Sequence, residues 1–245
     1  LVVSPGIPIN AKIKHLAIKL ALENKVKIIN EIDLFFETKP KAKIIGITGT
    51  NGKSTTAALL FHILKFNKIK CVIGGNYGFP ACNIKDPGKR GIIILELSSY
   101  QLDGAKKLSL DLATITNITK DHLDYHETFN NYKFSKFKIV DFLKKNGAFI
   151  FDSNNKLLNE MISKKKYRYI NIIKIKKDKT YNYVNDNDYL QGVHNLSNSS
   201  IAISIAKHLN ISIEKIKFAI ENFKGLPHRM EPLYISDRIK IINDS

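Results

Sequence analysis

Short apolar runs alternate with segments of helical spacing along most of the chain. The runs are rich in β-branched residues and have the length of buried strands, and they cover residues 43–48, 71–73, 91–97, 112–116, 148–152 and 167–173. Apolar positions three and four residues apart predict helices over residues 53–66, 129–144, 195–209 and 212–223. Alternation of this kind predicts an α/β fold with a central, mostly parallel sheet and flanking helices.

The two ends of the chain depart from this alternation. Residues 1–30 predict one αβ unit, with a turn at Ser4-Pro5-Gly6, a helix over 15–23 and a short strand over 26–29. A helix or linker follows and ends at Lys39-Pro40. Residues 176–188 are polar and rich in asparagine, which predicts a β-hairpin or an irregular loop, and the last residues predict a further strand.

The segment GITGTNGKST, residues 46–55, lies between a predicted buried strand and a predicted helix. A helix N-terminus offers unpaired N–H groups to an anion, and Gly49 and Gly52 let the backbone fold closely around it. Lys53 supplies a point charge for phosphates, and the Ser54 hydroxyl is a ligand for the magnesium that accompanies ATP. The general phosphate-loop pattern would place its first glycine at Ile47, so a plain glycine turn before a helix is the alternative.

Polar residues follow each of the next three predicted strands. They are Gly74-Gly75-Asn76, Glu96-Leu97-Ser98-Ser99, and Asn117 with Asp121-His122-Leu123-Asp124. Ligands bind beyond the carboxyl ends of parallel strands, so we expect these residues to share one edge with the glycine loop. A carboxylate at the mouth of a buried strand is costly without a partner, and a divalent cation opposite Ser54 would satisfy Glu96. The alternatives are a solvated or lysine-paired Glu96 and a structural role for His122.

The composition is typical of a globular protein with a basic surface. Of 245 residues, 44% are hydrophobic and 25% are charged, which allows one large or two modest domains. No apolar run could span a bilayer and no signal-peptide pattern opens the chain, so we expect a cytoplasmic protein without membrane partners. The net charge is +17, but the lysines are spread without an aromatic stacking pattern, which argues against a nucleic-acid partner. Cys71 and Cys82 predict free thiols.

The order of these motifs resembles the Mur ligases of bacterial cell-wall synthesis. The matching stretches are GTNGKST, GGN, LELSSYQL, NITKDHLDYH, GVHNLSN, GLPHRME and INDS. The resemblance implies a central domain similar to the P-loop NTPases and an ATP-dependent ligase that joins a carboxylate to an amine through an acyl phosphate. ELSSYQL after Lys53-Ser54 favours the member that adds D-glutamate to UDP-N-acetylmuramoyl-L-alanine. It also implies a monomer that acts on small molecules.

The resemblance assigns roles to individual residues. Residues implied to bind ATP are Gly49, Thr50, Asn51, Gly52, Lys53, Ser54, Thr55, Thr56, Asn198, Arg229 and Asp244. Two magnesium ions are implied, one held by Ser54 and Glu96 and the other by His122 and a carbamylated Lys136. The implied substrate-binding residues are Asn76, Ser98, Ser99 and His122. Catalysis would then depend on Lys53, Glu96, His122 and Lys136.

The resemblance also predicts the domain organisation. Residues 1–35 would be the last part of an N-terminal nucleotide-substrate domain, residues 36–225 the central ATP-binding domain, and residues 226–245 the start of a C-terminal domain. The chain would then be a fragment that binds nucleotide weakly and does not ligate. Three alternatives stay open: a ligase for another amino acid or for folate, a truncated nucleotide-binding module, and a basic nucleic-acid-binding module.

Overall fold

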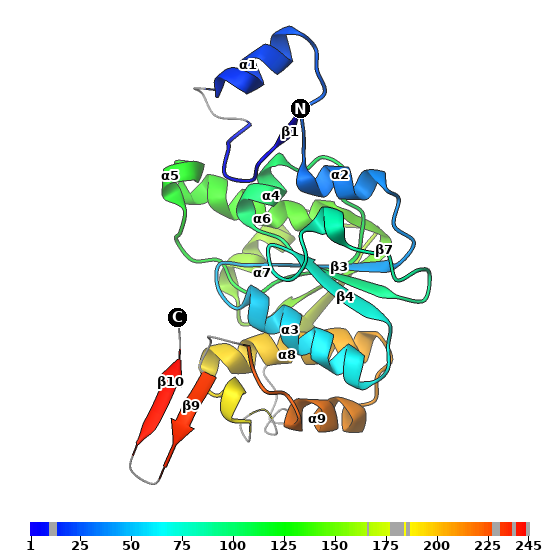
Figure 1. Ribbon diagram of the computed structural model, residues 1–245, viewed down its shortest axis with the longest axis vertical. Helices are drawn as coiled ribbons and strands as arrows, with labels where there is room; N and C mark the ends of the chain where they lie inside the picture. The colour runs from blue at the N-terminus through cyan, green and yellow to red at the C-terminus, as the bar shows by residue number, and fades with distance from the viewer. Residues whose placement is uncertain are drawn as a thin grey trace.

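A parallel sheet of six strands forms the centre of the molecule, in the order β4-β5-β3-β6-β7-β8 (Figure 1). The computed structural model describes residues 1–9, 14–165, 167–176, 184, 187–226, 231–236 and 239–243. The strands are β3 Lys43–Thr48, β4 Cys71–Gly75, β5 Ile92–Glu96, β6 Leu110–Ile115, β7 Leu143–Asp152 and β8 Asn171–Ile175. Every pair of neighbours in this sheet is parallel, which confirms the predicted α/β fold.

Two layers of helices cover the sheet because successive residues of each strand face opposite sides. Ile45 and Ile47 belong to the core beneath α3 (Lys53–Phe66), α8 (Val193–His208) and α9 (Ile213–Glu221). Ile44 and Ile93 belong to the core on the other face. The helices there are α2 Glu31–Glu37, α4 Ser99–Gly104, α6 Phe129–Asp141 and α7 Lys156–Ser163, and Figure 1 shows α2, α4 and α6 on the side opposite α3 and α8.

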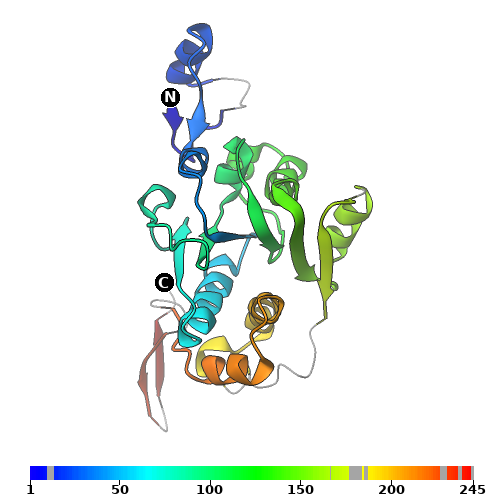
Figure 2. The ribbon, with the colours of Figure 1, turned by 90° about the vertical axis from the view of Figure 1, so that its right-hand side faces the viewer.

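Two small units lie at the ends of the chain. Near the N-terminus, β1 (Val2–Val3) pairs in parallel with β2 (Ile29–Asn30), and α1 (Leu16–Glu23) packs on them with its own small core. Near the C-terminus, β9 (Glu231–Ile235) and β10 (Lys240–Asn243) form an antiparallel pair that projects from the molecule (Figure 2). Among the described residues, no helix has the length and apolar character of a membrane span.

Several predicted boundaries were wrong. The strand predicted over residues 167–173 is β8, which begins only at Asn171 and continues to Ile175. The helix predicted over residues 129–144 ends at Asp141, because β7 already begins at Leu143. Most of the asparagine-rich segment 176–188 lies outside the described residues. The division at residues 35 and 225 stays a prediction.

The sheet topology places the glycine loop at the point where the chain reverses its direction of winding. After β3 the chain moves through α3 to the edge strand β4 and returns to β5, whereas β6, β7 and β8 extend the sheet on the other side of β3. The carboxyl end of β3 therefore lies between the ends of β5 and β6. Open α/β sheets bind their ligands at such a switch point.

Candidate functional site

The loop of residues 49–52 joins β3 to α3 and packs closely against α8. Gly52 has φ of +79°, in the left-handed region, and a Cβ atom there would lie 2.1 Å from Asn198 Oδ1. Asn198 comes from α8 and is buried, so α8 packs directly on the loop at this residue. Only glycine suits residue 52 for both reasons.

Two lysines converge on the carbonyl groups of this loop. Lys53 Nζ donates to Gly49 O at 3.1 Å and to Thr50 O at 2.8 Å. Lys136 Nζ, from α6, donates to the same Gly49 oxygen at 2.7 Å. Lys136 is only 2% exposed, and its burial, together with the charge of Lys53, lowers its pKa to about 7. The opposite charges of Asp121 and Glu96 act against that lowering, so these four ionisable groups share one electrostatic environment.

Glu96 is the last residue of β5 and lies beside the end of β3, opposite Ile47 in the register. Its side chain is 1% exposed. Asn76 Nδ2 donates to Glu96 Oε1 at 2.9 Å, so two predicted site residues are in contact. Glu96 Oε2 is buried and has no hydrogen-bond partner in the part of the chain that the structure describes. A buried carboxylate with one oxygen unsatisfied, beside the glycine loop, fits a divalent cation.

His122 lies at the start of the one-turn helix α5 (Leu123–His126), with φ of +48°. Its ring centroid is 5.0 Å from that of Tyr100 and 6.1 Å from that of Tyr132. The Tyr132 hydroxyl is 2.9 Å from Thr50 Oγ1, so this aromatic group connects His122 to the loop. The Nε2 atom of His122 lies 3.4 Å from Asp121 Oδ2. Because 43% of the His122 side chain is exposed, the imidazole is accessible at the rim of the site.

The remaining predicted site residues lie at the starts of two helices or outside the described residues. Ser98 caps α4 by accepting from Gln101 N–H, and the Ser99 hydroxyl is buried without a hydrogen-bond partner among the described residues. Ser54, Thr55 and Thr56 form the first turn of α3; Thr56 is buried, whereas Ser54 and Thr55 are half-buried. Arg229 and Asp244 lie outside the described residues.

A cavity of about 370 Å³ adjoins the loop beside the N-terminus of α3. Polar side chains and an apolar wall line it together: Asn51, Gly52, Thr55, Tyr189, His194, Asn195, Asn198, Phe223, Gly225 and Leu226. Such a mixture is typical of small-molecule sites, where apolar walls hold the ligand and a few polar groups orient it.

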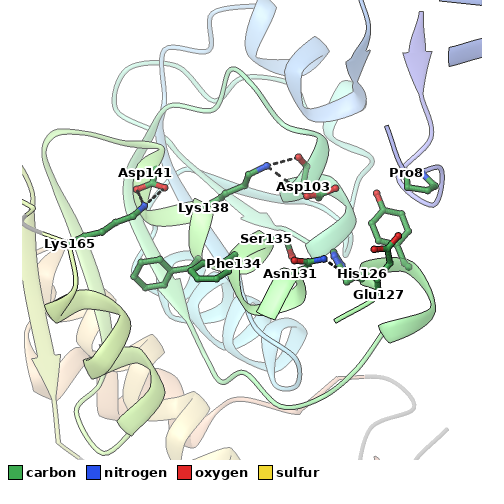
Figure 3. A pocket seen from close by; sticks show the side chains of 12 residues that line it. Pro8, Asp103, His126, Glu127, Asn131, Phe134, Ser135, Lys138, Asp141 and Lys165 are labelled. Atoms are coloured by element: carbon green, nitrogen blue, oxygen red, sulfur yellow. Dashed lines mark hydrogen bonds and ion pairs between the residues drawn. The ribbon is translucent and has the colours of Figure 1, made fainter. Parts of the chain in front are cut away.

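Figure 3 shows another cavity, of about 490 Å³, lined by residues of α4, α5 and α6 and by Pro8. Its charged residues include pairs that satisfy each other, such as Lys165 with Asp141. It contains none of the residues predicted for the site, because α6 directs Lys136 to Gly49 and presents Ser135 to this cavity.

The described residues contain no group of three or more His, Cys, Asp and Glu side chains that could hold a metal. A cation at Glu96 would therefore need hydroxyl, modified lysine, water or phosphate oxygens as further ligands.

The Mur ligase middle domain matches residues 47–220. The chain belongs to the Mur ligase family. It is 36% identical to a UDP-N-acetylmuramoylalanine–D-glutamate ligase of Rickettsia bellii and 36% identical to one of Zymomonas mobilis. Both alignments include 100% of this chain, which spans 58% and 56% of the two relatives.

Solved Mur ligases share the fold at lower identity. MurF from Acinetobacter baumannii has a TM-score of 0.68 at 19% identity, and the alignment covers 97% of this chain and 57% of that one. MurF from Thermotoga maritima, solved in complex with ADP, has a TM-score of 0.65 at 18% identity and covers 95% of this chain and 66% of its own. The central sheet of this chain and its flanking helices thus share the fold of these solved ligases.

The strand-end rule and the family motifs selected Lys53, Glu96, Asn76 and Asn198, which the fold brings to one edge. The sequence marks Asn117 only as a polar residue after a strand, but in the structure its side-chain amide makes two hydrogen bonds with the backbone of Asn51. Its signal in the sequence was its position directly after β6, the strand beside β3.

Proposed function

We propose that this chain is the ATP-binding part of a ligase that adds D-glutamate to UDP-N-acetylmuramoyl-L-alanine in peptidoglycan synthesis. The observation that carries the proposal is the convergence of Lys53 and Lys136 on the glycine loop of a Mur ligase fold, with buried Glu96 at the end of the neighbouring strand. The similarity to relatives of that name, over the whole chain, supports the choice of substrates. Because the chain spans 58% of the first of these relatives, the complete reaction is proposed for the longer protein.

The site has the features that a nucleoside triphosphate needs. The N-terminus of α3 presents N–H groups and a positive dipole end to the phosphates, and the Lys53 ammonium adds a full charge. The adjoining cavity would receive the nucleoside, with Asn198 at its polar side and Phe223 and Leu226 at its apolar side. The proposed roles of Gly49, Arg229 and Asp244 in nucleotide binding rest on the family motifs.

The residues present fit a magnesium ion. Glu96 Oε2 would be a ligand, with Ser54 as a second one, and the bound ion would neutralise charge on the phosphates. His122 and Lys136 would hold a second ion if Lys136 is carbamylated. A pKa near 7 keeps much of the buried Lys136 as a neutral amine, the form that attacks CO₂. The nitrogen lone pair would form the new N–C bond while one C=O π bond of CO₂ opens to an anionic oxygen, and one proton would leave the nitrogen, so the neutral amine would become an anionic ligand.

The proposed reaction requires charge stabilisation more than a protein nucleophile. The substrate carboxylate would attack the terminal phosphorus of ATP and release ADP. The D-glutamate amine would then attack the acyl carbon, release phosphate and lose a proton. Lys53 would stabilise charge on the transferring phosphoryl group, and Asn76, Ser98, Ser99 and His122 would position the substrate at the rim. A cytoplasmic, monomeric enzyme without nucleic-acid or membrane partners stays a prediction.

The test is an assay of the full-length gene product with ATP, UDP-N-acetylmuramoyl-L-alanine and D-glutamate. We expect phosphate release that depends on D-glutamate, a product heavier by one glutamyl residue, and loss of both in Lys53→Ala. L-Glutamate is the matched control and should give no product. Phosphate release with another amino acid or with a folate would instead favour another ligase of this type. Nucleotide binding without any ligation would favour a nucleotide-binding module.

A further inference from the structure

The end of β6 holds the backbone of the glycine loop through two residues. The side-chain amide of Asn117 pairs with the backbone of Asn51: Asn51 N–H donates to Asn117 Oδ1 at 3.0 Å, and Asn117 Nδ2 donates to Asn51 O at 2.9 Å. Thr50 N–H donates to the backbone oxygen of Asn117 at 2.9 Å. Thr116 Oγ1 also donates to Asn51 O, at 2.6 Å. The two central residues of the loop are therefore fixed by a neighbouring strand.

Only an amide of this length can make both side-chain bonds to Asn51. Aspartate has the same shape, but an ionised carboxylate accepts hydrogen bonds and donates none. Alanine removes both bonds. The contact between loop and strand is also close, because a Cβ atom at Gly49 would lie 1.9 Å from Thr116 Oγ1.

This arrangement determines which N–H groups of the loop can face an anion. The N–H groups of Thr50 and Asn51 are directed to Asn117. The N–H groups in the first turn of α3 have no acceptor within the helix and lie at the positive end of its dipole. Their direction relative to the cavity depends on the path of the loop that precedes them, and Asn117 fixes that path.

We propose that Asn117 is a positioning residue for the phosphates of the bound nucleotide, with Thr116 in a supporting role. The inference rests on the proposed function, since it assumes that a nucleotide binds at this loop. Asn117 acts through the backbone of Asn51 and does not itself touch the phosphates. Its removal should therefore weaken interactions with phosphate and leave interactions with the nucleoside unchanged.

The test compares the affinities of the full chain for ADP with Mg²⁺ and for adenosine, by calorimetry and ligand-observed NMR. We expect Asn117→Ala to weaken ADP binding at least about tenfold and to change adenosine binding less than about twofold. A residue that only stabilised the fold would affect both ligands alike. Asn117→Asp should weaken ADP binding further, because it adds a negative charge near the phosphates.

A matched control is Asn159→Ala. Asn159 lies in α7, and its Nδ2 also donates to two backbone oxygens, those of Ser153 and Asn155 in the turn before that helix. It should leave ADP affinity unchanged. If the Asn117 variants do not fold, Thr116→Val decides the question: it removes one bond to Asn51 O and should lower ADP affinity by a smaller factor.

Three results would overturn the inference: Asn117→Ala with normal ADP affinity, equal loss for ADP and adenosine, or an equal loss in Asn159→Ala. A chain that binds no ADP before any substitution contradicts the proposed function itself.

Discussion

Lys136 should make the stability of the folded chain depend on pH, and the replacement Lys136→Met should remove that dependence. The ammonium is buried, it lies close to the charge of Lys53, and its hydrogen bond to Gly49 O does not replace full hydration. Methionine has a similar length and no charge, so it keeps the packing of α6 while it removes the titrating group.

The magnitude follows from the two pKa values of Lys136. Its pKa falls from the ordinary 10.5 to about 7 in the folded state, which corresponds to about 5 kcal/mol at about 1.4 kcal/mol for each pH unit. Between these values the unfolded chain binds a proton that the folded chain does not, so stability rises with pH. Below pH 7 the charged Lys136 lowers the free energy of unfolding by this whole amount. Above pH 10.5 the lysine is neutral in both states and the destabilisation disappears. From pH 7.5 to 9.5 the free energy of unfolding should rise by about 2 to 3 kcal/mol.

The assay is urea unfolding of the unaltered chain and of Lys136→Met at several pH values, in buffers free of CO₂ so that the amine stays unmodified. The difference in the free energy of unfolding between the two proteins isolates Lys136 from other groups that titrate in this range. We expect the variant to be the more stable protein at pH 7.5, by an amount that shrinks as pH rises. A difference that does not change with pH would refute the argument that this lysine is buried as described.

Two further substitutions test the loop and the carboxylate. Gly52→Ala should weaken ADP binding at least about tenfold in calorimetry, because the new Cβ would lie 2.1 Å from Asn198 Oδ1. Gly88→Ala has the same left-handed strain, with φ of +85° and no atom within 4 Å of the new Cβ, so an equal effect there would contradict the steric reason. Glu96→Gln should abolish most of the increase in ADP affinity that Mg²⁺ produces, whereas exposed Glu160→Gln should not; an unchanged Mg²⁺ effect in Glu96→Gln would exclude the carboxylate as a ligand.

The sequence was sufficient to predict the central sheet, because the strands of that sheet are continuous apolar runs. The strands β3 and β5 are almost wholly buried on both faces, so their composition alone distinguishes them from loops. The helices α4 and α5 were not predicted, since they have six and four residues and are too short to show a helical period. The start of β8 was misplaced because Tyr167 and Tyr169 have strand propensity but precede the ladder with β7.

Residue patterns alone could predict the site only where it follows strand ends, whereas Lys136 and Asn198 were assigned through the resemblance to the Mur ligases. Glu96 and Asn76 come directly after or at the end of strands, and the rule for parallel sheets brought them together. Lys136 looks like one lysine among many in the sequence, and only the tertiary fold shows that it is buried against Gly49. The contact of Asn117 with Asn51 depends on the strand order, which places β6 beside β3.

The most direct test of nucleotide and metal binding at the glycine loop is a crystal structure of the chain with ADP and Mn²⁺, in which the anomalous signal locates the metal. We expect the diphosphate at the N-terminus of α3, within reach of Lys53, and a manganese peak beside the buried oxygen of Glu96. A nucleotide bound elsewhere, or a diphosphate at α3 with no metal at Glu96, would contradict it.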